Sequence, residues 1–160
     1  MNAKNLSDVL VHKEAVEAAA EVSAYLKRPA FRKDYDLSDQ LLRSSRRVAA
    51  LIAEGFGQIT DRQTADYYGR ARGSAYESHT HLTTARVEQY ITEEELTTTG
   101  GKYIEIVKML TPWINYLQPP TGASAANRRA KPTMRLSLEP APFASRLPTF
   151  ALRLATLPSA

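Results

Sequence analysis

Leu37-Ser-Asp-Gln-Leu-Leu-Arg43, Leu51-Ile-Ala-Glu-Gly-Phe-Gly57 and Tyr67-Tyr-Gly-Arg-Ala-Arg-Gly-Ser-Ala-Tyr-Glu77 are the three segments that decide the fold. Together they predict a helix that ends at glycines, a turn of four residues and a second helix that carries small residues on one stripe. Glycines inside the second helix indicate that another helix packs very close to it. The stretch therefore predicts a tightly packed helical hairpin.

Apolar residues recur every three or four positions in four parts of the chain, about 7–28, 37–56, 61–90 and 92–117. This period predicts an all-α fold, an up-and-down antiparallel four-helix bundle over residues 7–118. Pro29 would stop the first helix, and Asp36 or Ser38 would cap the second. The buried stripe predicted for the third helix is Tyr68, Ala71, Ala75, Ser78, Leu82, Ala85 and Gln89.

Glycine and proline set the expected helix ends. Gly55 and Gly57 would supply the left-handed backbone conformation that ends the second helix. Gly100-Gly101 would interrupt the fourth helix, leaving a main helix from about Lys102, and Pro112 would kink it. These expectations depend on local propensity alone.

Residues 119–160 differ in composition from the rest of the chain. Prolines recur through this segment, and residues 121–160 hold six basic residues against one acid. The other 120 residues hold 15 basic and 16 acidic residues, so the net charge of +4 belongs to the tail. We expect this Pro-rich basic tail to be mostly disordered.

Composition limits the chemistry that the chain can support. The chain has no cysteine, which excludes disulfides and thiolate metal sites, and no apolar run reaches the roughly 18–20 residues of a membrane span. His79 and His81 are two positions apart and would point away from each other on a helix. We therefore expect a cytoplasmic protein with no membrane partner, catalytic site, cofactor or metal site.

Two motifs, Ile52-Ala-Glu-Gly-Phe-Gly57 and Ala71-Arg-Gly-Ser-Ala-Tyr-Glu77, carry a family resemblance over about residues 8–118. With the opening Leu37 and Asp39-Gln40, they resemble the bacterial four-helix-bundle proteins first noticed as products of intervening sequences in 23S ribosomal RNA genes. The motif residues expected to have structural roles are Leu37, Gln40, Ile52, Ala53, Glu54, Gly55, Ala71, Arg72, Gly73, Ser74 and Glu77.

The resemblance implies an up-and-down bundle, and several proteins of this family assemble as ring-shaped homopentamers with a central channel. A distant relative, the accessory protein of diversity-generating retroelements, binds a reverse transcriptase and RNA through a basic surface. No catalytic activity is established for the family. This chain departs from the pattern at 47–51, where Arg-Val-Ala-Ala-Leu replaces the common Ser-Ile-Pro-Ala-Asn, and His12 stands where tryptophan is frequent.

Three groups of residues have competing interpretations. Arg43, Arg46 and Arg47 share one face of a helix, which is either a solvated or subunit-contact surface or a site of phosphate contact. Glu54 and Arg72 are predicted to form a structural ion pair. Gly69 and Gly73 are predicted to allow close helix packing.

The leading hypothesis is a non-enzymatic, homo-oligomeric binding or scaffolding module, most simply a homopentamer, that contacts RNA or DNA. The alternative is a protein-binding adaptor that docks through its basic tail and has no role with nucleic acid. Self-association is expected because an alanine-rich first helix and a small-residue third helix give one subunit a thin core, so neighbouring copies would supply further apolar contact.

Overall fold

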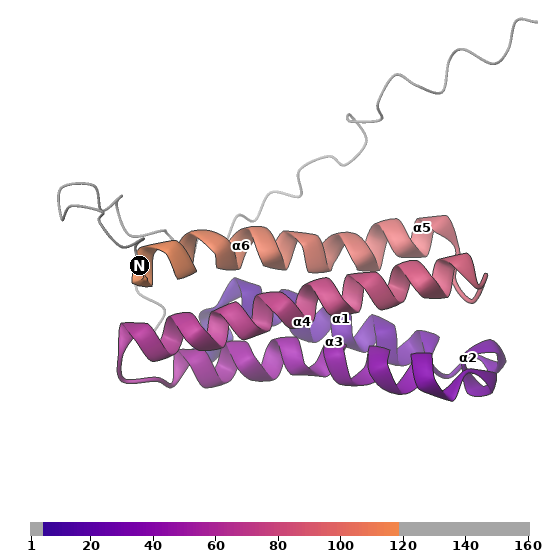
Figure 1. The fold of residues 1–160 in the computed structure, drawn as a ribbon, viewed down its shortest axis with the longest axis horizontal. Helices are drawn as coiled ribbons and strands as arrows, with labels where there is room; N and C mark the ends of the chain where they lie inside the picture. The colour runs from indigo at the N-terminus through magenta and orange to yellow at the C-terminus, as the bar shows by residue number, and fades with distance from the viewer. Residues whose placement is uncertain (1–4, 119–160) are drawn as a thin grey trace, which may run out of the picture.

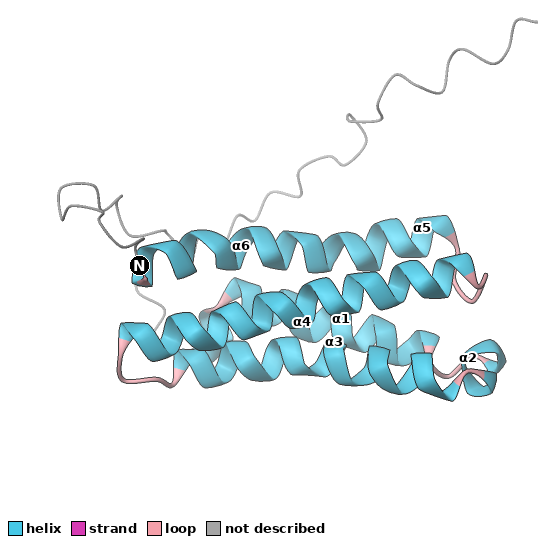
Figure 2. Ribbon diagram, viewed as in Figure 1, coloured by secondary structure: helices cyan, strands magenta, loops and turns pink. Residues whose placement is uncertain are grey.

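Helices joined by short loops make up the computed structural model, which describes residues 5–118 and has no strand in that range (Figure 2). In chain order the elements are η1 (Leu6–Asp8), α1 (Leu10–Tyr25), α2 (Pro29–Lys33), α3 (Tyr35–Phe56), α4 (Asp61–Val87), α5 (Glu93–Glu95), η2 (Leu96–Gly100) and α6 (Gly101–Leu117).

The long helices run antiparallel to their sequence neighbours (Figure 1). The α3–α4 hairpin has the most extensive contact, α6 packs against α4, and α1 closes the bundle against α3 and α6. The predicted all-α four-helix bundle is confirmed. The predictions made for residues 119–160 lie outside the described residues.

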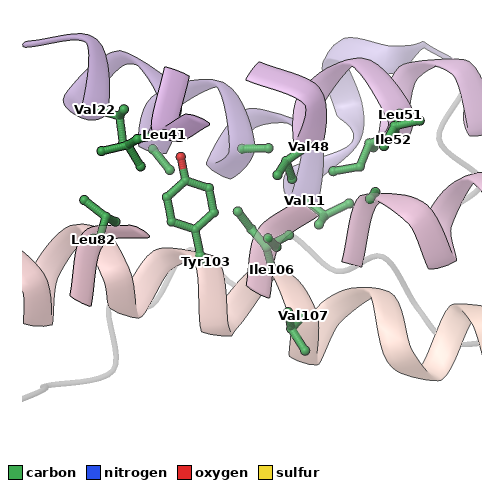
Figure 3. Packing of buried hydrophobic residues seen from close by; sticks show 14 of the residues in the cluster. Val11, Val22, Leu41, Val48, Leu51, Ile52, Leu82, Tyr103, Ile106 and Val107 are labelled. Atoms are coloured by element: carbon green, nitrogen blue, oxygen red, sulfur yellow. The ribbon is translucent and has the colours of Figure 1, made fainter. Parts of the chain in front are cut away.

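The core consists mainly of one apolar stripe from each long helix, to which Phe31 of α2 is added (Figure 3). Tyr103, Phe31, Leu41 and Ile52 are among its largest side chains, and all four are fully buried. Burial of a side chain of this size stabilises the fold by about 1.5–3 kcal/mol. The small buried residues of α1 and α4, such as Ala15, Ala18, Ala71 and Ala75, let each of these helices lie close to its neighbours α3 and α6.

The first helix ends earlier than the sequence predicted. It stops at Tyr25, and Pro29 begins the short helix α2, a position where its missing N–H has no partner to lose. Asp34 caps α3 by accepting a bond from the Leu37 N–H at 3.1 Å, so the prediction of Asp36 or Ser38 as the cap was wrong. Ser38 instead donates its hydroxyl to the Phe31 carbonyl at 2.6 Å.

Gly55 and Gly57 do not have the predicted left-handed conformation. Gly57 ends α3 with φ −82°, in the right-handed region. Gly55 lies inside α3, where an added Cβ would stand 2.7 Å from Cε1 of Tyr68 on α4. The glycine at position 55 therefore serves the close approach of the two helices and not the helix end.

The end of α4 also differs from the prediction. The helix stops at Val87, and Gln89 is exposed with φ 62°, so its assignment to the buried stripe was wrong. The left-handed residue turns the chain so that the Tyr90 N–H donates to the Ala85 carbonyl at 2.8 Å. The other six residues of the predicted stripe are buried.

Gly100 and Gly101 do not interrupt the fourth helix. The chain passes from α5 through a π-helical turn, η2, directly into α6, which continues through Pro112. Thr99 in this turn is fully buried, and its hydroxyl donates to Glu21 and bonds with Tyr25, each at 2.7 Å. These contacts to α1 stabilise the wide turn.

Candidate functional site

The three arginines proposed for phosphate contact lie on the outer surface of α3, and all are exposed. Arg43 Nε bonds to Asp39 Oδ2 at 2.9 Å, one helical turn away. Arg46 and Arg47 form no ion pair with another residue of the range 5–118. These two guanidinium groups of α3 are thus available to an anionic partner.

Acidic side chains share this part of the surface. Because Gly55 stands beside Tyr67 and Tyr68, the antiparallel pairing places Arg47 level with Tyr76 and Glu77. Glu77 is exposed and lies 3.7 Å from His81 Nε2. A single bundle therefore presents a mixed surface, which limits its affinity for a polyanion.

The motif residues divide between core and surface. Leu37, Ile52, Gly55, Ala71 and Ser74 are buried, and Ala53 and Arg72 are partly buried. Gln40, Glu54, Gly73 and Glu77 are exposed. The first set explains the packing of the α3–α4 hairpin, whereas the exposed set has no role in the core of one subunit.

The predicted ion pair between Glu54 and Arg72 is absent from the described residues. Arg72 lies seven positions before His79, so the two share a side of α4, and His79 Nδ1 faces the Gly100 carbonyl of η2 at 3.3 Å. Arg72 therefore lies toward α6, away from the exposed Glu54 on α3. Sequence spacing could not reveal which side of α4 would face which neighbour.

Gly69 and Gly73 also differ from the prediction of close packing within the chain. A Cβ added to either residue would meet no atom within 4 Å, unlike a Cβ added at Gly55. Both belong to an outward-facing stripe of α4, which we call the α4 stripe. Its members follow one another every three or four positions and are all uncharged: Gly69, Gly73, Tyr76, Thr80, Thr83 and Val87.

The α4 stripe is a solvent-facing helix surface without a charged side chain. It extends for about 27 Å along the helix. Its two large side chains, Tyr76 and Val87, are 52% and 70% exposed. Val16 on α1, 48% exposed, is followed one turn later by the exposed Ala20, which gives a second uncharged surface on a different helix.

The polar groups between α1 and α6 have structural partners. Lys102 Nζ bonds to Glu21 Oε1 at 2.6 Å and lies 3.8 Å from Glu17. Glu21 in turn accepts the Thr99 hydroxyl. The cluster fixes η2 against α1 and leaves no free base beside a nucleophile.

Neither a metal site nor a membrane span is present in the part of the chain that the structure describes. No group of three His, Asp or Glu side chains there could hold a metal ion. None of the helices there combines the length and hydropathy that a crossing would need. The buried Ser74 is not presented to solvent, so it is not placed as a nucleophile.

The contact of Glu95 with Arg28 was not predictable from the sequence. Glu95 bonds Arg28 through Nη1–Oε2 at 3.0 Å and also closes a capping box with Thr92. The two partners are 67 positions apart, and no local pattern connects them. The spacing Thr92-x-x-Glu95 did carry the capping signal.

The comparison with solved structures gives a neighbour of the same fold. A crystal structure of a protein of unknown function from the S23 ribosomal protein family of Bacteroides thetaiotaomicron superposes with a TM-score of 0.61. The two sequences are 24% identical, and the match covers 66% of this chain and 98% of that one. At this identity the likeness shows the fold.

The comparison with curated protein sequences gave no match. A family profile, however, covers the bundle. The 23S rRNA-intervening sequence protein family matches residues 7–112, which include both sequence motifs, the α3–α4 hairpin and most of α6. The chain therefore belongs to the 23S rRNA-intervening sequence protein family.

Proposed function

We propose that this protein is a non-enzymatic, cytoplasmic binding or scaffolding module that assembles as a homopentamer and contacts nucleic acid through basic surface. The observation that supports the contact is that Arg46 and Arg47 are exposed and have no acidic partner within residues 5–118. Guanidinium groups in this state can bind phosphate oxygens without first breaking an ion pair.

Self-association is supported by the α4 stripe and by the surface at Val16. Glycines in a helix destabilise it by roughly 0.5–1 kcal/mol each relative to alanine, so two glycines facing open space have no benefit within one subunit. A neighbouring helix could approach the bare backbone at Gly69 and Gly73. Two different uncharged surfaces favour head-to-tail contacts, which can close into a ring. The number five follows the family resemblance.

Assembly would also increase the number of unpaired arginines that can contact one nucleic acid. The two unpaired arginines of one α3 give little affinity at physiological salt, but five copies of α3 would present about ten, and several phosphates could be bound at once. Contacts of this kind are made to the phosphate backbone of the nucleic acid and carry little sequence preference. The proposed interface would therefore bind RNA or DNA of any sequence.

The test compares full-length protein, a version that ends at Leu117, an Arg46→Gln/Arg47→Gln variant and the control Arg43→Gln. Binding to a labelled RNA is measured at 50 and 200 mM salt. We expect the double variant to lose about tenfold in affinity and to show a weaker salt dependence, while the control changes little because Asp39 already neutralises Arg43. Equal binding by the double variant and the intact protein would contradict the proposal.

The same experiment separates the adaptor alternative. If intact protein shows no salt-dependent retention of RNA or DNA and a polypeptide co-purifies instead, the protein is an adaptor for another protein. If binding follows the presence of residues 118–160 alone, the tail is the whole interface.

Light scattering tests the proposed homopentamer and should give a mass near 89 kDa, about five times the 17.8 kDa of one chain.

A further inference from the structure

One end of the bundle carries a basic and aromatic surface that no family motif includes. Four basic residues fall within seven positions around Pro29: Lys27, Arg28, Arg32 and Lys33. Tyr35 follows them and is 76% exposed. We call the exposed set Lys27, Arg32, Lys33 and Tyr35 the α2 corner.

The charges of the α2 corner are free. Arg28 is neutralised by Glu95, but Lys27, Arg32 and Lys33 are exposed and form no ion pair with another residue of the described range. Of the two nearest acids in sequence, Asp34 caps α3 and accepts the Tyr90 hydroxyl at 3.4 Å, whereas Asp36 is exposed.

The corner is also held in place by contacts that do not involve its exposed side chains. Phe31 is fully buried, and its ring meets Tyr90 edge to face with centroids 5.3 Å apart. The Ser38 hydroxyl bonds the Phe31 carbonyl at 2.6 Å. The backbone of the corner is therefore preorganised, which reduces the entropy lost when a ligand binds.

Tyr35 has no structural role that would explain its position. Among residues 5–118 its ring meets no other ring and no cation, and its hydroxyl has no hydrogen-bond partner. An exposed aromatic ring that follows three free cations in the chain matches the way in which proteins bind single-stranded nucleic acid, with stacking on the bases and positive charge on the phosphates.

The corner continues toward the arginines of α3. Tyr35 and Arg46 are eleven positions apart, close to three helical turns, so they lie on the same side of α3 about 16 Å apart. Asp39 lies between them but is bound to Arg43. A strand that stacks on Tyr35 could therefore continue to Arg46.

We propose that the α2 corner is a binding site for single-stranded nucleic acid, with Tyr35 as the stacking platform and Lys27, Arg32 and Lys33 as phosphate contacts. This inference rests on the proposed nucleic-acid contact and adds that the nucleic acid bound is single-stranded. Duplex nucleic acid does not offer base faces, so Tyr35 distinguishes the two.

The experiment uses full-length protein and measures anisotropy of a labelled single-stranded oligouridylate and of an RNA duplex of the same length. The variants are Tyr35→Ala, Tyr35→Phe and Arg32→Gln/Lys33→Gln. The control is Ile59→Ala, which removes an apolar side chain that is 98% exposed at the turn between α3 and α4. All four positions are exposed, and thermal melts establish that each variant is folded.

We expect Tyr35→Ala to weaken single-strand binding about tenfold or more and duplex binding less than twofold. Tyr35→Phe should stay within twofold of the parent for both ligands. The charge variant should weaken both ligands and reduce the slope of log affinity against log salt by about 0.7 for each lost contact. Ile59→Ala should behave as the parent protein.

Three results would overturn the inference. If Tyr35→Ala binds the single strand as the parent does while the parent shows salt-dependent binding, the corner is wrong and the proposed function stands. Polyglutamate could displace the labelled oligonucleotide as well as an unlabelled oligonucleotide does. If it does, and if Tyr35→Ala weakens the binding of polyglutamate and of the oligonucleotide alike, the corner is a site for acidic protein segments. If the parent binds neither RNA, the proposed function fails together with the inference.

Discussion

Arg28 and Glu95 form a two-bond ion pair that joins the residue before α2 to α5, with Nη1–Oε2 at 3.0 Å. The Arg28 guanidinium also lies 4.6 Å from the centre of the Tyr25 ring. Glu95 accepts the Thr92 N–H at 2.8 Å. One carboxylate thus holds a helix start and a connection between distant parts of the chain.

The Arg28 hydrogen bonds lower the pKa of Glu95 from 4.5 to about 2. Because the folded-state pKa is lowered, the stabilisation is present above pH 4.5 and is lost as the pH falls toward 2. We expect Glu95→Gln to lower the free energy of unfolding at pH 7 by about 1 kcal/mol, a value reduced for the partial exposure of both side chains.

Thermal melts between pH 7 and pH 2 check this prediction. The parent should lose stability faster than Glu95→Gln through that range, so that the two converge near pH 2. Glu94→Gln removes the same charge from the neighbouring exposed position and should leave the stability unchanged at pH 7. A constant gap between parent and Glu95→Gln at every pH would contradict the assignment.

The bundle could be predicted from the sequence because the information is periodic. The buried faces of the helices 10–25, 35–56 and 61–87 follow a period near 3.6, and that signal survives errors of several residues at the helix ends. The ends themselves depend on single contacts. The Asp34 cap and the left-handed Gln89 are examples that composition does not reveal.

Contacts between helices were less predictable. The sequence indicated that α4 carries charged and small residues, but the rotation of α4 decides whether Arg72 meets α3 or α6. The same rotation leaves Gly69 and Gly73 facing outward. The arginine face of α3 was predictable because its three residues lie at helical spacing on one helix. The α2 corner was not predictable, because its residues are brought together by the fold of the chain between α1 and α3.

Tyr103 provides a test of core polarity. Its hydroxyl is buried without a hydrogen bond, and burial raises the pKa of the phenol while the nearby Ser45 and Ser78 hydroxyls oppose this. Those serines donate to the carbonyls of Leu42 and Ser74. We expect Tyr103→Phe to leave the free energy of unfolding unchanged or raise it by up to about 1 kcal/mol.

Urea denaturation measures the effect, with Tyr25→Phe as the matched comparison. Tyr25→Phe removes a hydroxyl that is bonded to Thr99 at 2.7 Å, so it should lower the free energy of unfolding by about 1 kcal/mol. A similar loss for Tyr103→Phe would mean that the phenol is bonded to Ser45 or Ser78 in solution.

Gly55 should tolerate no larger residue. An alanine would place its Cβ 2.7 Å from Tyr68 Cε1 and 3.0 Å from Tyr67 Cβ, so α3 and α4 would have to separate. Overpacking of this kind lowers the free energy of unfolding by about 1–3 kcal/mol, more than alanine gains in helix propensity. Chemical denaturation of Gly55→Ala checks the sign, and a stabilised variant would contradict the close approach of α3 and α4 at Gly55.

Gly69→Ala/Gly73→Ala is the opposite case and tests self-association. Both added methyl groups meet open space in one subunit, so the isolated bundle should gain about 1–2 kcal/mol from helix propensity. If the α4 stripe packs against a neighbouring helix, the same methyl groups would push the subunits apart. We therefore expect a variant that is more resistant to denaturant when dilute but has a lower mass in light scattering. Thr83→Ala, which changes the stripe without filling glycine space, serves as the control and should leave the mass unchanged. An oligomer of unaltered mass and affinity in the glycine variant would place the subunit contact on another face of the bundle.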